Sequence, residues 1–447
     1  MPEPRSQRFT LLTIAFLFLT ITLFTSPDPA VGEVFSPEDA LSYKRCYEAA
    51  ISPDGGWIAY TVIVQRAADD KPGGTYLELY LVSPKTGKIR PFITGEVSVR
   101  SPRWSPDGSR LAFLTSRGEK AKTQVWMIPF GGGEAVQVTS SETNVSGFRW
   151  HPKGDRIAYI ATEPEGKRKK EMDDKGYGFI FYEENLRHRN IYMQGIANEG
   201  GEGEAKRLTD GITVWDFEFD PAGGRIALAA SPKNLVDHSY MFKKIHILYL
   251  ETERLTQLTD NPGKLDNFAW SPDGKRIVYA AALERRDHAA SQAYVIDAKG
   301  GHELNLTEPG FRGHVEWVGW KDNGTVLYYA GEGAWPTLSV VKASGGKRKV
   351  ILDSEKTGTV FYHPSYTKDF KHFAFAGSSP EIPGDIFYWQ GGSKETKRLT
   401  TLNPWISGRE LGRQEVISYL ARDGLEIEAL LVYPCLLYTS PSPRDRS

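Results

Sequence analysis

A turn sequence of the form Ser-Pro-Asp-Gly returns along this chain, and no other feature of the sequence constrains the fold as strongly. Its spacing is about 50 residues, apart from one longer interval between Pro152 and Pro221. Seven copies are recognisable, the last two weaker than the others, over residues 50–60, 103–113, 149–159, 218–228, 269–279, 319–329 and 365–375. A period of this length is typical of solenoids and propellers, which repeat one small supersecondary unit.

Each copy predicts a tight turn between two antiparallel strands. In the first copy, Ser52 can accept hydrogen bonds at the first corner and Pro53 presets φ at the second. Asp54 suits the third corner and Gly55 closes the turn. An aromatic or apolar residue ends the strand before the turn, and alternating apolar residues begin the strand after it.

A second hairpin signal follows most copies, and it often ends in Leu-Thr, as at Leu208-Thr209 and Leu258-Thr259. Examples cover residues 79–90, 125–138, 245–258, 293–306, 338–351 and 386–399. Two hairpins make four antiparallel strands, which is one propeller blade. The sequence therefore predicts an all-β fold, a seven-bladed β-propeller of four-stranded antiparallel blades. A β-helix or an open sandwich fits these repeat lengths poorly.

Composition agrees with many strands and turns and excludes several classes of protein. Aromatic residues make up 12% of the chain, with 44 Gly and 27 Pro. The net charge of -1 gives no basic excess for binding nucleic acid, and we expect no nucleic-acid partner. The two cysteines, Cys46 and Cys435, cannot form a disulfide framework or a cysteine-based zinc site. The sequence carries no signal for a particular oligomeric state.

The first 32 residues have the pattern of a secretory signal peptide. Arg5 and Arg8 precede an uncharged run from Phe9 to Phe24, and small residues follow at Ala30 and Gly32. The run is shorter than the roughly 20 residues that span a bilayer, which favours cleavage over a retained membrane anchor. We therefore expect a mature protein that starts near Glu33, is periplasmic or secreted, and has no membrane partner after cleavage.

The last 13 residues, 435–447, differ in composition from everything before them. They resemble the translation of a transposase adapter used in sequencing libraries, so we interpret them as an artefact and exclude them from fold reasoning. The alternative is a genuine Ser/Pro-rich tail. On the first interpretation the natural protein continues past Pro434.

The repeats from Phe35 to Pro434 resemble the TolB-type propeller units found in TolB and in the prolyl oligopeptidase family of serine peptidases. Residues 33–410 are the expected propeller. The following segment, 411–434, resembles the stretch that opens the α/β-hydrolase domain in this peptidase family. It predicts a hairpin with Arg422-Asp423-Gly424 as its turn. The alternative for this segment is an incomplete eighth blade.

The third blade carries an insertion from Pro164 to Asn190, which begins with a charged stretch at residues 167–175. Acylaminoacyl-peptidase-like and dipeptidyl-peptidase-like members have an insertion near this place. In the dipeptidyl-peptidase type a pair of Glu residues holds the amino terminus of the substrate. The resemblance assigns this role to Glu183 and Glu184. The alternative is a solvated loop in which these side chains pair with Arg187 or Arg189.

No catalytic residues can be assigned. Gly-x-Ser-x-Gly is absent, and the nearest sequence, at residues 342–346, lacks the first Gly and falls in a hairpin turn. The nine histidines show no catalytic or metal-ligating spacing, and there is no phosphate loop or dinucleotide fingerprint, so we expect no metal and no cofactor. The family's catalytic residues lie beyond the point where this chain ends.

The sequence therefore predicts the substrate-gating propeller of an exported serine peptidase that cleaves short peptides near their amino terminus, with this chain alone inactive. One alternative is a TolB-like periplasmic propeller that binds a protein partner and has no enzymatic activity. A calcium- or sugar-binding propeller fits less well, because Asp54, Asp107 and Asp273 lie in turns with few other acids nearby.

Overall fold

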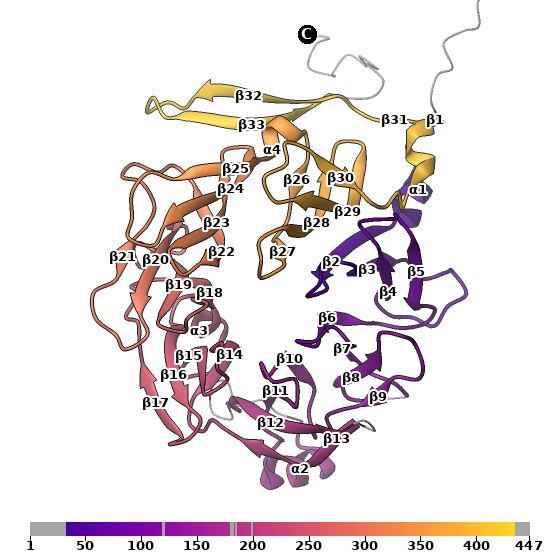
Figure 1. Ribbon diagram of the computed structural model, residues 1–447. Coiled ribbons are helices and arrows are strands. Elements are labelled where there is room, and N and C mark those ends of the chain that lie inside the picture. Colours follow the sequence, from indigo (N-terminus) through magenta and orange to yellow (C-terminus); the bar gives the residue numbers. More distant parts are fainter. Residues whose placement is uncertain (1–32, 119–120, 179–182, 184–185, 198–199, 434–447) are drawn as a thin grey trace, which may run out of the picture.

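The computed structural model describes residues 33–118, 121–178, 183, 186–197 and 200–433. The predicted signal peptide (1–32) and the predicted artefact (435–447) lie outside this range. Seven sheets form a closed ring, and the strands of each sheet are consecutive in the sequence (Figure 1). Neighbouring strands within a blade pair antiparallel. The predicted seven-bladed β-propeller is thus confirmed.

The strands of the first four blades are β2 (Arg45–Ile51), β3 (Ile58–Val64), β4 (Tyr76–Val82) and β5 (Ile89–Ile93); β6 (Arg100–Trp104), β7 (Arg110–Thr115), β8 (Gln124–Pro129) and β9 (Val136–Gln137); β10 (Val145–Trp150), β11 (Arg156–Thr162), β12 (Arg189–Ala197) and β13 (Gly200–Arg207); and β14 (Thr213–Phe219), β15 (Arg225–Ser231), β16 (Lys244–Tyr249) and β17 (Arg254–Gln257).

The strands of the last three blades are β18 (Leu265–Trp270), β19 (Arg276–Ala282), β20 (Ser291–Asp297) and β21 (Leu304–Asn305); β22 (His314–Asp322), β23 (Thr325–Glu332), β24 (Trp335–Lys342) and β25 (Lys349–Asp353); and β26 (Val360–Phe361), β27 (Ser365–Tyr366), β28 (His372–Ser379), β29 (Ile382–Gln390) and β30 (Thr396–Arg398). In blade 7 the innermost strand is split, so that β26 and β27 both pair with β28.

The repeat turns connect the innermost strand of each blade to the second, and they bind their own acidic residue. In blade 2 the Ser105 hydroxyl donates to Asp107 Oδ1 at 2.6 Å and accepts the Arg110 backbone N–H at 2.9 Å. Hydrogen bonds from Ser105 and Ser109 lower the pKa of Asp107 to about 2. Gly108 has a φ of 73°, which explains why glycine closes the turn. The turn carboxylates are therefore engaged within their own turns.

Aromatic side chains join neighbouring blades at the end of the innermost strands. The indole N–H of Trp104 in blade 2 donates to the Ala50 carbonyl of blade 1 at 2.9 Å. The same bond recurs from Trp150 to Arg103, from Trp270 to Glu218 and from Trp320 to Ala269. In blade 7 the Tyr366 hydroxyl donates to the Trp320 carbonyl at 2.9 Å. The repeat thus encodes the contact between blades as well as the turn.

The ring closes without a strand shared between its two ends. Blades 1 and 7 pack through a common apolar cluster that includes Ile58, Tyr60 and Ile386. Beside it the Asn403 side chain accepts the Lys44 N–H at 2.7 Å and donates to the Lys44 carbonyl at 2.6 Å. The segment near Phe35 to Tyr47, whose place the sequence leaves open, does not complete the last blade, because its end begins β2 of blade 1.

The segments that come just before and just after the propeller run side by side next to this seam. β1 (Glu33–Val34) pairs in parallel with β31 (Arg409–Glu410). Arg409 also forms a bidentate ion pair with Asp39 of α1 (Pro37–Ser42), at 2.8 and 3.0 Å. The other short helices are α2 (Lys167–Asp174), α3 (Val236–Tyr240), α4 (Ser354–Thr357) and the 3₁₀ helix η1 (Pro404–Gly408). None of the described helices has the length and apolar character needed to cross a bilayer.

After the seventh blade, β32 (Gln414–Leu420) and β33 (Glu426–Val432) form a separate antiparallel hairpin. Its turn is the predicted one: the Gly424 N–H donates to the Ala421 carbonyl at 2.9 Å, with φ of 83° at Gly424. The hairpin is therefore observed where the sequence predicts it. Its assignment to a hydrolase domain stays a prediction.

Candidate functional site

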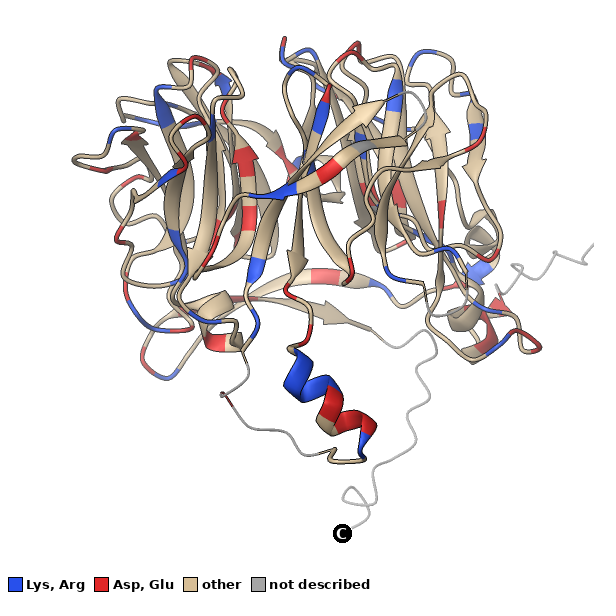
Figure 2. Ribbon diagram, turned by 90° about the horizontal axis from the view of Figure 1, so that it is seen from below, with Lys and Arg blue, Asp and Glu red and all other residues tan. Residues whose placement is uncertain are grey.

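The two faces of the ring differ. All repeat turns lie on one face, which we call the turn face. Because strands alternate in direction, the β11–β12 connection lies at the opposite end of its blade, on what we call the insertion face. Figure 2 shows α2, α1 and the hairpin β32–β33 on the same side of the ring. The insertion thus shares a face with the segment that follows the propeller.

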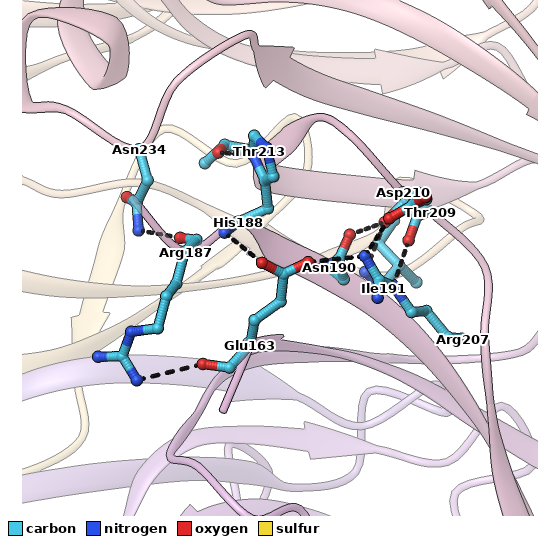
Figure 3. Close-up of polar contacts among 10 residues, drawn as sticks. All are labelled: Glu163, Arg187, His188, Asn190, Ile191, Arg207, Thr209, Asp210, Thr213 and Asn234. Carbon is cyan, nitrogen blue, oxygen red and sulfur yellow. Dashed lines mark hydrogen bonds and ion pairs between the residues drawn. The ribbon is translucent and has the colours of Figure 1, made fainter. Parts of the chain in front are cut away.

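Glu163 joins the two ends of the insertion (Figure 3). It directly follows β11, and its carboxylate accepts the backbone N–H of His188, the residue before β12, at 3.0 Å. The same carboxylate accepts Asn190 Nδ2 at 3.0 Å and Arg207 Nη2 at 2.7 Å. Arg187 Nη1 donates to the Glu163 carbonyl at 3.2 Å. These bonds fix the points at which the insertion leaves and re-enters the blade.

Further bonds tie the returning segment to blade 4. The His188 ring Nδ1 lies 2.9 Å from the Thr213 hydroxyl at the start of β14. Asn234 Nδ2, in the connection before α3, donates to the Arg187 carbonyl at 2.8 Å. Arg207 also pairs with Asp210. The base of the insertion is therefore held from two blades at once.

Of the two predicted site residues, Glu183 lies within the described part of the chain and Glu184 lies outside it. Glu183 is in a turn with a φ of 60°, a backbone conformation that is unusual for a residue with a side chain. Its carboxylate is 41% exposed and lies 3.9 Å from Lys233 Nζ. The arginines considered as partners of these glutamates form hydrogen bonds elsewhere. Arg187 donates to the Glu163 carbonyl, and Arg189 donates to the Ser146 hydroxyl.

His238 of α3 extends this surface. Its Nδ1 is buried without a hydrogen-bond partner among the described residues, and its ring packs against Phe242. Burial lowers the pKa of His238, and the Lys233 charge lowers it further, while Glu183 opposes the shift. Glu183, Lys233 and His238 therefore lie near one another on the insertion face. Chemically, the exposed carboxylate of Glu183 can accept an ammonium group.

A serine, a histidine and an aspartate also meet on this face, where blades 5 and 6 adjoin. The Ser291 hydroxyl donates to Asp266 Oδ2 at 2.5 Å, and His314 Nδ1 accepts the Ser291 backbone N–H at 2.9 Å. A catalytic triad needs the serine hydroxyl on the histidine and the histidine on the acid. This arrangement joins the serine to the acid instead, so it supplies no activated nucleophile. In the described residues no group of His, Cys, Asp and Glu side chains is placed to hold a metal ion.

Sequence reasoning missed several charged residues, although the repeat contains a signal for most of them. The first residue of each copy lies on the innermost part of its blade, and in blades 2, 3 and 4 it is Arg103, Arg149 and Glu218. Reading this one position down the seven copies would have revealed a charged segment of the inner wall. Glu163 gives no such signal, because it is set by a connection found in one blade only.

Two curated proteins resemble the chain in sequence. Dipeptidyl-peptidase 5 of Porphyromonas gingivalis is 25% identical over 403 residues, which cover 85% of this chain and 57% of that protein. The uncharacterized peptidase YuxL of Bacillus subtilis is 25% identical over 259 residues, covering 58% of this chain and 33% of that protein. The chain thus spans little more than half the length of these relatives at most. No family model matches it.

Solved structures share the fold. Pyrococcus horikoshii acylaminoacyl peptidase superposes with a TM-score of 0.67 at 15% identity, over 90% of this chain and 59% of that one. A prolyl endopeptidase gives a TM-score of 0.60 at 12% identity, over 88% and 55%. The β-propeller domain of the Trilobed protease from Pyrococcus furiosus gives 0.57 at 15% identity, over 81% of this chain and 99% of that domain. The chain is therefore a seven-bladed β-propeller that is similar in sequence to a dipeptidyl-peptidase and in fold to the propellers of acylaminoacyl peptidase and prolyl endopeptidase.

Proposed function

We propose that this chain is the propeller portion of an exported serine peptidase that hydrolyses short peptides near their amino terminus. The observation that carries the proposal is the 25% identity to dipeptidyl-peptidase 5 across 85% of this chain. That relative is longer, since the match covers 57% of it. In the proposal the nucleophile, base and oxyanion donors come from a further segment, and the propeller restricts which peptides reach them.

The insertion face supports a role in holding substrate. Glu163 fixes the base of the insertion, and Glu183 presents an exposed carboxylate whose described ionic partner lies at 3.9 Å. In the proposal Glu183 and Glu184 bind the protonated amino terminus of a peptide through charge-assisted hydrogen bonds. The hairpin β32–β33 leaves the propeller on this same face. In the proposal the catalytic segment follows the hairpin on the face that carries the insertion.

The catalytic part of the proposal is tested with chromogenic dipeptidyl anilides. We expect the purified 447-residue chain to release no chromophore. The source gene, read across the codon for Pro434, is expected to continue into a segment with Gly-x-Ser-x-Gly followed by Asp and His, and that longer product is expected to be active. Turnover by the 447-residue chain, or a stop codon after Pro434, contradicts the proposal and favours a propeller that only binds a partner.

The role of the two glutamates is tested in the longer product with substrates that differ only at the amino terminus. We expect Glu183→Gln and Glu184→Gln to raise KM at least tenfold for a substrate with a free amine. KM for its N-acetylated form should stay unchanged. Glu171→Gln, on α2 of the same insertion, is the matched control. Equal effects on both substrates would show that these residues do not hold the amine.

A further inference from the structure

The axis region of the ring holds a cluster of charges contributed by four blades. Arg103 of β6 and Arg149 of β10 occupy the same position of the repeat, directly before Trp104 and Trp150. Arg149 Nη2 forms an ion pair with Asp216 Oδ1 of β14 at 2.8 Å. The other carboxylates are Glu48 of β2 and Glu218 of β14. Since the repeat turns follow directly, the two arginines lie toward the turn face, away from the insertion.

Arg103 is the member of this cluster that lacks a partner. Among the described residues its guanidinium forms no ion pair and no hydrogen bond, and its Nε is buried. The nearby charge of Arg149 is the main reason why the pKa of Arg103 falls to about 10, with burial second. A partly buried guanidinium beside another cation is costly to leave without a counter-ion.

The carboxylates around Arg103 do not supply that counter-ion. Asp216 Oδ1 already accepts Arg149 and the Phe217 N–H, at 2.8 Å each. Burial raises the pKa of Glu48, and it raises that of Glu218 to about 7, so Glu218 is only partly ionised at neutral pH. Asp216 is therefore engaged by Arg149, and burial disfavours the charged form of the other two carboxylates.

The backbone of Arg103 is held in place, and solvent reaches the charged side chains beside it. The Trp150 indole N–H donates to the Arg103 carbonyl at 3.1 Å, which fixes the backbone of Arg103 against blade 3. The side chains of Arg149 and Asp216 are 21% and 47% exposed, so solvent enters the region. Arg149 already donates to Asp216 and to the Phe148 carbonyl, whereas the fork of Arg103 has no described partner. A free guanidinium fork matches the planar, bidentate geometry of a carboxylate.

We propose that Arg103 and Arg149 form a carboxylate-binding site in the axis region of the ring, and that its ligand is the free C-terminal carboxylate of a short peptide. The choice of a peptide as the source of the carboxylate rests on the proposed function, whereas the site itself rests on the geometry above. The peptide carboxylate takes the place of the missing counter-ion of Arg103. The site lies apart from the insertion, toward the opposite face.

The test is isothermal titration calorimetry of the 447-residue chain at pH 7 and constant ionic strength. The probes are tetra-alanine, tetra-alanine amide and acetate. We expect tetra-alanine to bind at least tenfold more tightly than its amide, because the amide lacks the negative charge. Arg103→Gln should abolish this preference, and Arg103→Lys, which keeps the charge but loses the planar fork, should reduce it. Arg254→Gln on the outer strand β17 removes the same charge elsewhere and should leave it intact.

The possible outcomes separate this inference from the proposed function. Equal binding of acid and amide, absence of binding, or a preference that persists in Arg103→Gln overturns the inference, whatever the longer product hydrolyses. Binding of acetate through Arg103 without binding of tetra-alanine upholds a carboxylate site and overturns the peptide as its ligand. Circular dichroism of each variant confirms folding, which we expect for Arg103→Gln because this residue has no described partner to lose.

Discussion

In several blades one tryptophan packs against the preceding blade and donates a hydrogen bond to its backbone. Blade 4 lacks this tryptophan and therefore lacks the hydrogen bond. Phe219 stands where Trp104, Trp150, Trp270 and Trp320 stand in other blades. It packs edge-on against His151 of blade 3, with ring centroids 5.2 Å apart. His151 in turn places its ring Nε2 3.1 Å from the Gly223 carbonyl. A different residue therefore provides the polar contact at this junction.

The contribution of one such bond can be measured by replacing Trp104 with Phe. We expect Trp104→Phe to lower the free energy of unfolding by about 1 kcal/mol, because the Ala50 carbonyl loses its donor while most of the apolar contact remains. Urea denaturation measures the change. Trp126→Phe is the control, since the Trp126 indole donates no hydrogen bond among the described residues and stacks under Arg117 instead. Equal losses for both variants would show that packing, not the hydrogen bond, matters.

Glu218 makes the stability of the propeller depend on pH. Burial raises its pKa in the folded state to about 7, from an ordinary value of 4.5. The folded protein therefore binds more protons than the unfolded chain between these values, and this group's contribution to stability falls as pH rises from 4.5 to 7. We expect Glu218→Gln to be more stable than the wild type at pH 8, by about 1–3 kcal/mol, and to lose that advantage near pH 4.5. Urea denaturation midpoints of both proteins, measured between pH 4.5 and 8, test this prediction. A difference between the two proteins that stays constant with pH would contradict it.

Among the structural elements, the insertion is where sequence reasoning reached least far. The repeat predicts blade 3, and the charged stretch from Lys167 predicts an interruption, because both are local patterns. The contacts that fix the insertion join Glu163 to His188 and Arg207, which are 25 and 44 residues away. No local pattern records such pairings. The substrate-binding role predicted for Glu183 and Glu184 rests on the family resemblance alone. The structure adds the position of Glu183.

Replacing Glu163 with Gln tests whether it holds the insertion in place. We expect Glu163→Gln to lower the free energy of unfolding by about 1–2 kcal/mol, because the hydrogen bond that it accepts from charged Arg207 weakens. Hydrogen exchange should accelerate at residues 186–190 and stay unchanged in blades 5 and 6. Lys169→Ala breaks an ion pair within α2 and is expected to change stability by less than about 0.5 kcal/mol. Uniform acceleration over the whole ring would contradict a local role.

At the scale of the whole molecule, the seven repeats made the propeller fold predictable. They did not predict how the ring closes at the seam between blades 1 and 7. Each blade is a contiguous stretch, so the copies from Ala50 to Phe375 predict the number and order of the sheets. How the ring closes depends on Asn403 and Lys44, which lie outside the repeat and 359 residues apart. Arg409 and Asp39 are likewise paired across 370 residues.

The seam should be the place where the ring opens first. Asn403→Ala removes two hydrogen bonds to Lys44, so we expect a loss of about 2 kcal/mol and faster hydrogen exchange in β2 and β28. Asn261→Ala is the matched control, because Asn261 also bonds backbone carbonyls, those of Lys243 and Gly263. The Asn261→Ala variant should show faster hydrogen exchange near blade 4 instead. The same exchange pattern in both variants would mean that the seam is no weaker than the other junctions.

The contiguity of the blades also sets an order of events during synthesis. As the chain leaves the ribosome, the hairpins of each blade are complete once about 50 residues have emerged, and they can form before the next blade exists. Closure must wait, because Asn403 is made last among the residues that meet Lys44. Until then blade 1 exposes the apolar surface around Ile58 and Tyr60 that blade 7 later covers. The nascent protein therefore depends on protection of its first blade until its last one is made.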